Sequence, residues 1–230
     1  MIVLISPSKT FSNDIKKGTS EPVFINKAKA LRNKIAKLSL NEIKTVFKLS
    51  DKLTNEVYNY YQKDNVESTA INLYEGVLYK ALKEDTLKIK DNKLYILSAM
   101  YGLLKPFDNI SYYRLDFNIK YFGNLYNYWS EPVNNYLKTN YQDEIIINLA
   151  SKEFSSLINK LPNLITIEFS NLDNKKLSSV LLKQLRGYLA NIIINNNIKT
   201  LDELKKIKIK DFFYNENLSN NNIIYFSNGS

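Results

Sequence analysis

The sequence contains no cysteine and no histidine among its 230 residues. Without cysteine, the chain has no disulfide, no thiolate nucleophile and no iron–sulfur or zinc–thiolate site. Without histidine, it has no Ser-His-Asp triad, no histidine general base and no histidine-ligated haem or iron centre. Only oxygen ligands remain for a metal ion, which favours weak binding of the Mg²⁺ type. Catalysis would therefore depend on Asp, Glu, Lys, Tyr, Ser or Thr, and we expect no metal site and no cofactor.

Long apolar runs and linkers are absent as well. No apolar run approaches the roughly 20 residues that a membrane-spanning helix needs, and the first ten residues lack the features of a signal peptide. No stretch rich in glycine, proline or serine divides the chain, and hydrophobic residues make up 44% of it. We therefore expect one domain over residues 1–230, in a monomeric cytoplasmic protein without a membrane partner.

Arginine is scarce, with only Arg32, Arg114 and Arg186 in the chain, yet the net charge is +9 because lysine is abundant. A basic balance suggests partners rich in phosphate, such as nucleic acid. The Lys-, Asn- and Ile-rich composition is also what an AT-rich genome produces. Charge alone leaves both explanations open.

Periodicity in the sequence predicts an α/β fold. Apolar runs predict strands at 2–5, 94–97, 144–149, 164–169, 212–214 and 223–226. Amphipathic spacing and capping boxes predict helices over 24–38, 39–62, 125–137 and 177–195 and after Thr200. The alternation of Leu115 and Phe117 with Asp116 and Asn118 predicts a further short strand. We expect a mixed, partly parallel central sheet flanked by helices.

Residues 39–62 are predicted to form two helices joined by a very short turn, beginning at the capping box of Ser39 and Glu42. Such a helix-hairpin-helix-like pair is able to clamp a DNA backbone, with Lys48 and Lys52 at the turn. The glycines that allow a close approach to phosphates are missing there. Two helices that simply pack together are the alternative interpretation.

Three of the predicted strands end in similar small and polar residues. These are Ser6-Pro7-Ser8-Lys9, Ser98 to Gly102, and Asn148 to Lys152. Because the carboxyl ends of parallel neighbours meet at one edge of a sheet, we expect these ends to form one pocket. The predicted lining is Ser6, Lys9, Ser98, Tyr101, Lys105, Arg114, Asn148, Ser151 and Lys152. Hydroxyls, cations and stackable tyrosines suit a phosphodiester backbone with a base nearby.

The segment 94–117 is the densest in such residues, because Arg114 lies there directly after two tyrosines and near Asp108 and Asp116. One interpretation is a loop that holds an anionic or planar partner. The alternative is that its tyrosines and Leu103-Leu104 belong to the core, with Arg114 paired to Asp116 or Asp108.

The chain resembles the YaaA family of peroxide stress proteins. The resemblance is carried by Ile5 to Thr10, Leu49 to Leu53, Tyr74 to Tyr79, Leu97 to Leu115, Leu125 to Trp129, Ile147 to Ser151 and Arg186-Gly187. It implies a bacterial intracellular protein that limits oxidative damage, is linked to lowered free iron, and binds duplex or branched DNA in a basic cleft. It also implies a helix-hairpin-helix-like element. The residues matched to the cleft are Ser6, Lys9, Lys105, Arg114, Lys152 and Arg186.

The leading hypothesis is a non-catalytic DNA-binding protein, with Lys48 and Lys52 added to those cleft residues. The alternative is an enzyme on nucleic acid or nucleotides, of the base-excising, N-glycosidic type. Its candidate residues are Tyr101, Tyr113, Asp108 and Asp116, which could stack a base and activate water. Direct iron binding by carboxylates ranks last, because a site without histidine or cysteine would be weak and unselective.

Overall fold

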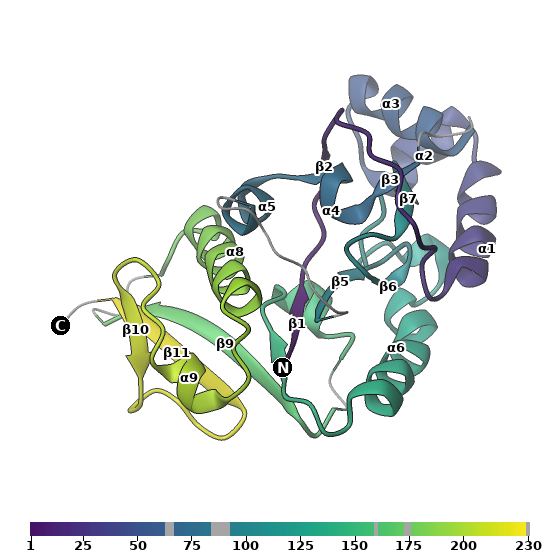
Figure 1. Cartoon of the computed structure of the whole chain (residues 1–230). Helices are drawn as coiled ribbons and strands as arrows, with labels where there is room; N and C mark the ends of the chain where they lie inside the picture. The colour runs from purple at the N-terminus through teal and green to yellow at the C-terminus, as the bar shows by residue number, and fades with distance from the viewer. Residues whose placement is uncertain (63–66, 84–92, 159–160, 173–175, 229–230) are drawn as a thin grey trace.

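The predicted mixed sheet is present in the computed structural model, which describes residues 1–62, 67–83, 93–158, 161–172 and 176–228 (Figure 1). Within these residues, seven strands form one sheet in the order β10-β11-β9-β8-β1-β5-β6. They are β1 (Ile2–Ile5), β5 (Leu94–Ser98), β6 (Gly102–Leu104), β8 (Ile146–Asn148), β9 (Leu164–Asn171), β10 (Phe212–Asn215) and β11 (Ile223–Asn228). The run from β11 to β5 is parallel, and β6 and β10 add antiparallel edges.

Strand β1 lies inside the sheet because its four residues are all apolar and fully buried. It pairs with β5 on one side and β8 on the other, in the register Val3↔Leu94 and Ile2↔Ile146. A continuous apolar run suits a parallel strand that is covered on both faces. The ladder ends before Pro7, which has no backbone N–H. The three predicted strand ends are therefore brought to one edge, as expected.

The helices extend the fold on both sides of the sheet. They are α1 (Ile25–Ala36), α2 (Leu40–Phe47), α3 (Asp51–Gln62), α4 (Ala70–Leu73), α5 (Val77–Leu82), η1 (Lys120–Phe122), α6 (Leu125–Tyr141), α7 (Lys152–Ser155), α8 (Ser179–Asn195) and α9 (Leu201–Lys205). Helices α1, α2 and α3 lie together at the end far from β10, β11 and α9, and α5 lies beside α8 (Figure 1). In the described part of the chain, no helix combines the length and apolar character needed to cross a membrane.

Two small strand pairs lie outside the main sheet. Strand β2 (Thr10–Phe11) pairs antiparallel with β4 (Tyr74–Glu75), and β3 (Glu67–Thr69) pairs with β7 (Asn109–Ser111). The first pair ties the segment after β1 to the segment before α5. These two segments are thereby held side by side above the carboxyl end of β1.

The predicted helix pair is confirmed as α2 and α3. The Ser39 side chain accepts a hydrogen bond from the backbone of Glu42, and the Glu42 side chain accepts one from the backbone of Ser39. At the turn, Lys48 adopts a left-handed conformation with φ 52°, and an ion pair joins Lys44 to Asp51. Lys48 and Lys52 are both exposed. Their proposed contact with a DNA backbone stays a prediction.

The prediction of a strand at residues 115–118 is wrong. Residues 112–116 have no regular secondary structure, and a turn follows at 117–118. Leu115 and Phe117 are buried, but the ring of Phe117 stacks on Tyr126 with centroids 4.6 Å apart. The alternation therefore arises from burial within a loop, with Phe117 packed against α6, rather than from pairing in a sheet.

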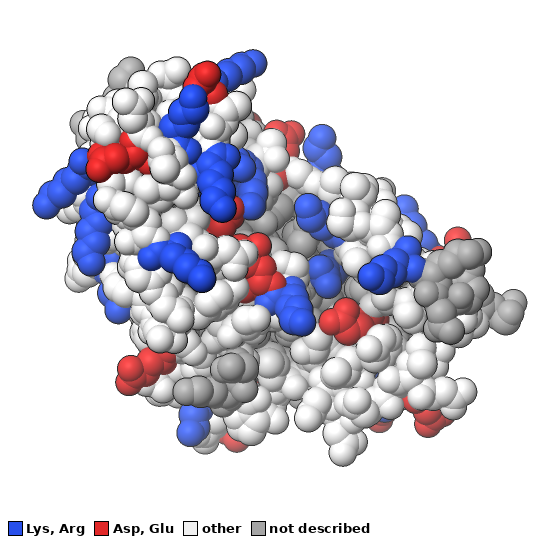
Figure 2. All heavy atoms as spheres, turned by 180° about the vertical axis from the view of Figure 1, so that it is seen from behind, with Lys and Arg blue, Asp and Glu red and all other residues white. Residues whose placement is uncertain are grey.

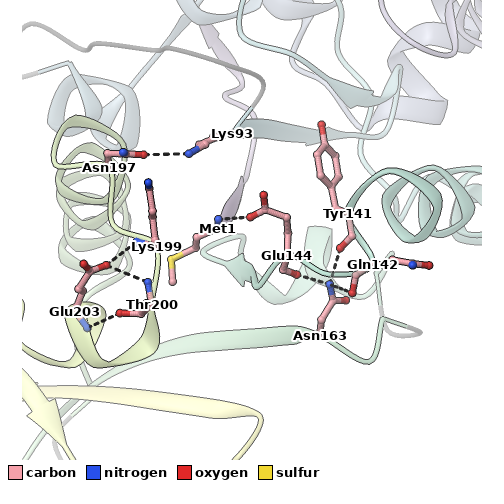
Figure 3. Close-up of polar contacts among 10 residues, drawn as sticks. All are labelled: Met1, Lys93, Tyr141, Gln142, Glu144, Asn163, Asn197, Lys199, Thr200 and Glu203. Carbon is pink, nitrogen blue, oxygen red and sulfur yellow. Dashed lines mark hydrogen bonds and ion pairs between the residues drawn. The ribbon is translucent and has the colours of Figure 1, made fainter.

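The amino end of the central strands is closed by polar contacts (Figure 3). The amino group of Met1 forms an ion pair with Glu144. The side-chain amide of Asn163 donates a hydrogen bond to the Tyr141 carbonyl at 2.8 Å and another to the Glu144 carbonyl. This end of the sheet is thus occupied by the protein's own groups, and the candidate site lies at the other end.

Candidate functional site

A cavity of about 420 Å³ lies at the carboxyl edge of the sheet. Five segments that are distant in sequence line it: residues 6–10, 76–79 and 113–116, then Ser151 with Glu153 and Phe154, then Lys183 with Arg186. It is therefore built at the edge where open α/β sheets bind ligands.

The floor of the cavity is fixed by Ser6, the first residue after β1. Its hydroxyl oxygen accepts a hydrogen bond from the backbone N–H of Ser151 at 2.9 Å, and its carbonyl accepts one from the hydroxyl of Tyr79 at 3.0 Å. These contacts connect the loop after β1 to the loop after β8 and to α5. Ser6 thus joins three walls, one contact being made by its side chain and the other by its backbone.

Gly76 lets the backbone before α5 approach the loop after β1. It has φ +121°, which side-chain-bearing residues rarely adopt, and a Cβ added there would lie 3.0 Å from the Ser8 hydroxyl oxygen. Both observations explain why glycine is needed at this position. The wall formed by 76–79 depends on it.

Helix α8 contributes two cations, Lys183 and Arg186, which are three residues apart and therefore on one helix face. The next residue, Gly187, lets α8 approach α5, because a Cβ there would lie 2.3 Å from the Leu78 carbonyl oxygen. Burial lowers the pKa of Arg186, and the charge of Glu168 opposes the shift. The buried Nε of Arg186 has no hydrogen-bond partner among the described residues, so it retains a donor.

Arg114 is placed by the hydroxyl of Tyr61 on α3, which accepts from the Arg114 N–H at 3.1 Å and donates to its carbonyl at 2.8 Å. The neighbouring Tyr113 is buried, and its hydroxyl lies 2.6 Å from that of Tyr74 and 2.9 Å from that of Ser98. Within the described residues, the guanidinium of Arg114 forms no ion pair. The expected alternative, a pair with Asp116 or Asp108, is therefore wrong.

Lys9 and Asp116 form an ion pair at 2.7 Å in the cavity wall. Glu153 lies in the same wall, and one of its carboxylate oxygens is buried without a hydrogen-bond partner in the described part of the chain. Burial and then the charge of Asp116 raise the pKa of Glu153, while Lys9 and a backbone hydrogen bond from Phe117 oppose the shift. The cavity thus combines a carboxylate paired to lysine with a carboxyl group that holds its proton more tightly than usual.

We expect replacement of Glu153 by glutamine to stabilise the protein increasingly as pH rises. A carboxyl whose pKa is raised in the folded state binds its proton more tightly there than in the unfolded state. As the pH rises from the ordinary pKa to the raised one, the wild-type protein therefore loses part of its free energy of unfolding. The variant lacks that loss. Urea unfolding of both proteins from pH 4 to pH 8 measures the difference.

The control for this experiment is Glu131→Gln, since Glu131 is exposed on α6 and does not line the cavity. It measures the effect of removing a carboxylate at a surface position, and the stabilisation in Glu153→Gln should exceed that effect increasingly as pH rises. A flat difference for Glu153→Gln across the range would contradict the raised pKa.

The structure gathers part of the predicted site and leaves part of it elsewhere. The predicted residues that line the cavity are Ser6, Lys9, Tyr113, Arg114, Asp116, Ser151 and Arg186. Those that do not line it are Lys48, Lys52, Ser98, Tyr101, Lys105, Asp108, Asn148 and Lys152. Lys152 is exposed beside Ser151, whereas Ser98 and Asn148 are buried beneath the loops.

Asp108 and Tyr101 make structural contacts rather than facing the cavity. The fully buried carboxylate of Asp108 accepts hydrogen bonds from the Ser20 hydroxyl at 2.7 Å and from the Lys105 N–H at 2.8 Å. The buried hydroxyl of Tyr101 accepts from the N–H of Ser111 at 3.1 Å. The interpretation of the tyrosines as core is confirmed for Tyr101 and Tyr113, since each is 5% exposed.

The sequence prediction did not assign Gly76, Tyr79 or Lys183 to the site, and it named Glu153 only as a nearby carboxylate that could equally form a salt bridge. Lys183 carried a usable signal, because it precedes Arg186 by three residues on a predicted helix. Glu153 follows the third strand end directly, but nothing local shows which way its side chain turns. The part played by α5 depends on its packing against α8, which periodicity does not reveal.

The charges around the cavity favour an anionic partner. We define the basic rim as Lys9, Arg114, Lys183 and Arg186. The cavity lining contains only two acidic residues, Asp116 and Glu153. Figure 2 shows Lys and Arg side chains gathered around a hollow on the face opposite to that of Figure 1, with a few acidic side chains among them. Over the described residues, no three acidic side chains gather into a cluster able to hold a metal ion.

The sequence was compared with known proteins. The family model described as "Peroxide stress protein YaaA" matches residues 1–218. A UPF0246 protein of Finegoldia magna is 36% identical, with 98% of this chain and 97% of the relative covered. A UPF0246 protein of Fusobacterium nucleatum is 35% identical over 99% of this chain and 98% of its own length. A UPF0246 protein of Clostridioides difficile is 31% identical, with 98% of this chain and 99% of the relative covered.

Proposed function

Because the chain belongs to the peroxide stress protein YaaA family, we propose that it acts in peroxide stress as a monomeric DNA-binding protein. Its ligand is duplex or branched DNA, and the basic rim contacts the phosphates. Lys105, Lys152 and the α2–α3 turn with Lys48 and Lys52 extend the interface. In this proposal, the protein limits free iron indirectly rather than by holding the metal.

One observation carries the proposal: four cations from three separate segments surround one cavity, and the two arginines among them have no ion-pair partner in the described residues. Arginine recognises phosphate with two parallel hydrogen bonds, so an unpaired arginine in a hollow is well suited to a phosphodiester. The net charge of +9 attracts the same ligand from a distance.

The test is the fluorescence anisotropy of labelled duplex, single-stranded and four-way-junction DNA over a series of salt concentrations. If about four phosphates are neutralised, the logarithm of the affinity should fall with a slope of about −3.6 against the logarithm of salt concentration. That slope corresponds to a loss on the order of 100-fold between 50 and 200 mM salt. Binding that does not change with salt, or no binding at low salt, sinks the proposal.

A second candidate function, an enzyme of the N-glycosidic type on nucleic acid or nucleotides, is favoured by one observation. Asp116 and Glu153 lie in the same cavity, one paired to Lys9 and the other with a raised pKa. Carboxyl groups in such different environments suit acid–base work. Chromatographic detection of free base released from DNA decides between the two candidates.

A further inference from the structure

The interior of the cavity is not explained by contact with a duplex backbone. Phosphates lie on the outside of a duplex and need only a basic surface, which the rim supplies. Behind that rim lies a hollow of about 420 Å³, inside the range of roughly 300–1,000 Å³ that is typical of small-molecule sites. The cavity is therefore deep enough to enclose a group of the size of a nucleotide.

Apolar and aromatic residues also line the cavity. They are Val77, Leu78, Tyr113, Leu115 and Phe154. Phe154 is held rigidly, because its ring contacts Phe117 edge-on with centroids 5.6 Å apart. A planar, apolar face fits such a wall, and a nucleobase has two of these faces.

The polar groups of the cavity suit the edge of a base. The unpartnered oxygen of Glu153 is buried, and an unmet hydrogen bond there costs free energy until a ligand supplies the partner. A carboxyl group accepts hydrogen bonds in its ionised form and can also donate one in its protonated form, which burial of Glu153 favours by raising its pKa. Base edges present both donors and acceptors.

We propose that the cavity receives one nucleotide turned out of a bound DNA strand, with Glu153 contacting the polar edge of its base and the basic rim holding the flanking phosphates. This inference rests on the proposed function. Extruding a base costs a few kcal/mol of stacking and pairing, and the cost is lowest for a base that is already unpaired. A duplex with an unpaired nucleotide should therefore bind more tightly than a fully paired one.

The experiment compares two labelled duplexes of the same length and flanking sequence, one fully paired and one with a single bulged nucleotide. Anisotropy at 150 mM salt should give an affinity at least about tenfold higher for the bulged duplex, equivalent to about 1.4 kcal/mol. Equal affinities overturn the inference but leave the proposed function standing. Binding to neither duplex overturns both.

Two variants show whether the preference comes from the cavity. Thr10→Trp fills the mouth from an exposed lining position, and Glu153→Gln changes the contact with the base edge at constant size. Both should bring the ratio of the affinity for the bulged duplex to that for the paired duplex close to one. The control Val180→Trp adds the same ring at a residue that is 56% exposed and outside the lining. A preference that survives Thr10→Trp overturns the inference.

Discussion

Replacement of Arg114, Lys183 and Arg186 together by alanine is expected to weaken duplex DNA binding by roughly 1,000-fold or more. In the proposed complex each cation contacts a phosphate through a charge-assisted hydrogen bond worth about 1.5–3 kcal/mol, and every 1.4 kcal/mol is a factor of ten. The slope of affinity against salt should become shallower by about 2.7, since about three fewer counterions are released. Anisotropy titrations at several salt concentrations measure both quantities.

The matched control removes the same charge elsewhere. Lys34, Lys138 and Lys206 are exposed, lie on or next to α1, α6 and α9, and are absent from the cavity lining. Their triple replacement by alanine should reduce the affinity severalfold through the loss of long-range attraction only. Equal losses for the two triple variants would assign binding to the overall charge of +9 and not to the rim.

Replacement of Trp129 by alanine is expected to lower the free energy of unfolding by about 4 kcal/mol, because removing a buried aromatic side chain leaves a cavity in the core. Trp129 is fully buried, and its Nε1–H donates to the Ala99 carbonyl at 2.8 Å. Gly102 packs against the same ring, since an added Cβ would lie 2.5 Å from it. The residue thus supports the turn after β5, from which the chain continues toward Arg114.

Urea unfolding followed by far-UV circular dichroism measures this effect, since Trp129 is the sole tryptophan and its fluorescence is lost in the variant. Trp129→Phe is the control. It keeps most of the apolar volume and loses the hydrogen bond, so a smaller cost of about 1–2 kcal/mol is expected. A loss below about 1 kcal/mol in Trp129→Ala would falsify this account of the core.

Regular elements with a strong local signal could be predicted from the sequence. The strand Ile2–Ile5 is a continuous apolar run, and the capping boxes at Ser39 and Thr200 both begin helices as expected. These features depend on neighbouring residues only, so local rules identify them. Parallel pairing of the first strand with two others was the premise from which a single pocket was predicted, and the structure shows that pairing.

The site was only partly predictable, because side-chain direction in a loop depends on tertiary packing. Asp108 and Asp116 are equivalent in the sequence, yet Asp108 turns inward to Ser20 and Asp116 turns to Lys9 in the cavity. The apparent strand at 115–118 failed for the same reason, since burial within a loop produces the same alternation as a pleated strand. The local sequence predicts neither the direction of these side chains nor the origin of the alternation.

The five segments that line the cavity also determine when it can form. Contacts such as that of Ser6 with Ser151 span 145 residues, and pairings of high contact order form slowly because long loops must close first. No contiguous fragment shorter than most of the chain contains all the walls. We therefore expect the cavity to form late in folding, and a ligand that binds there would report that the segments between Ser6 and Arg186 have come together.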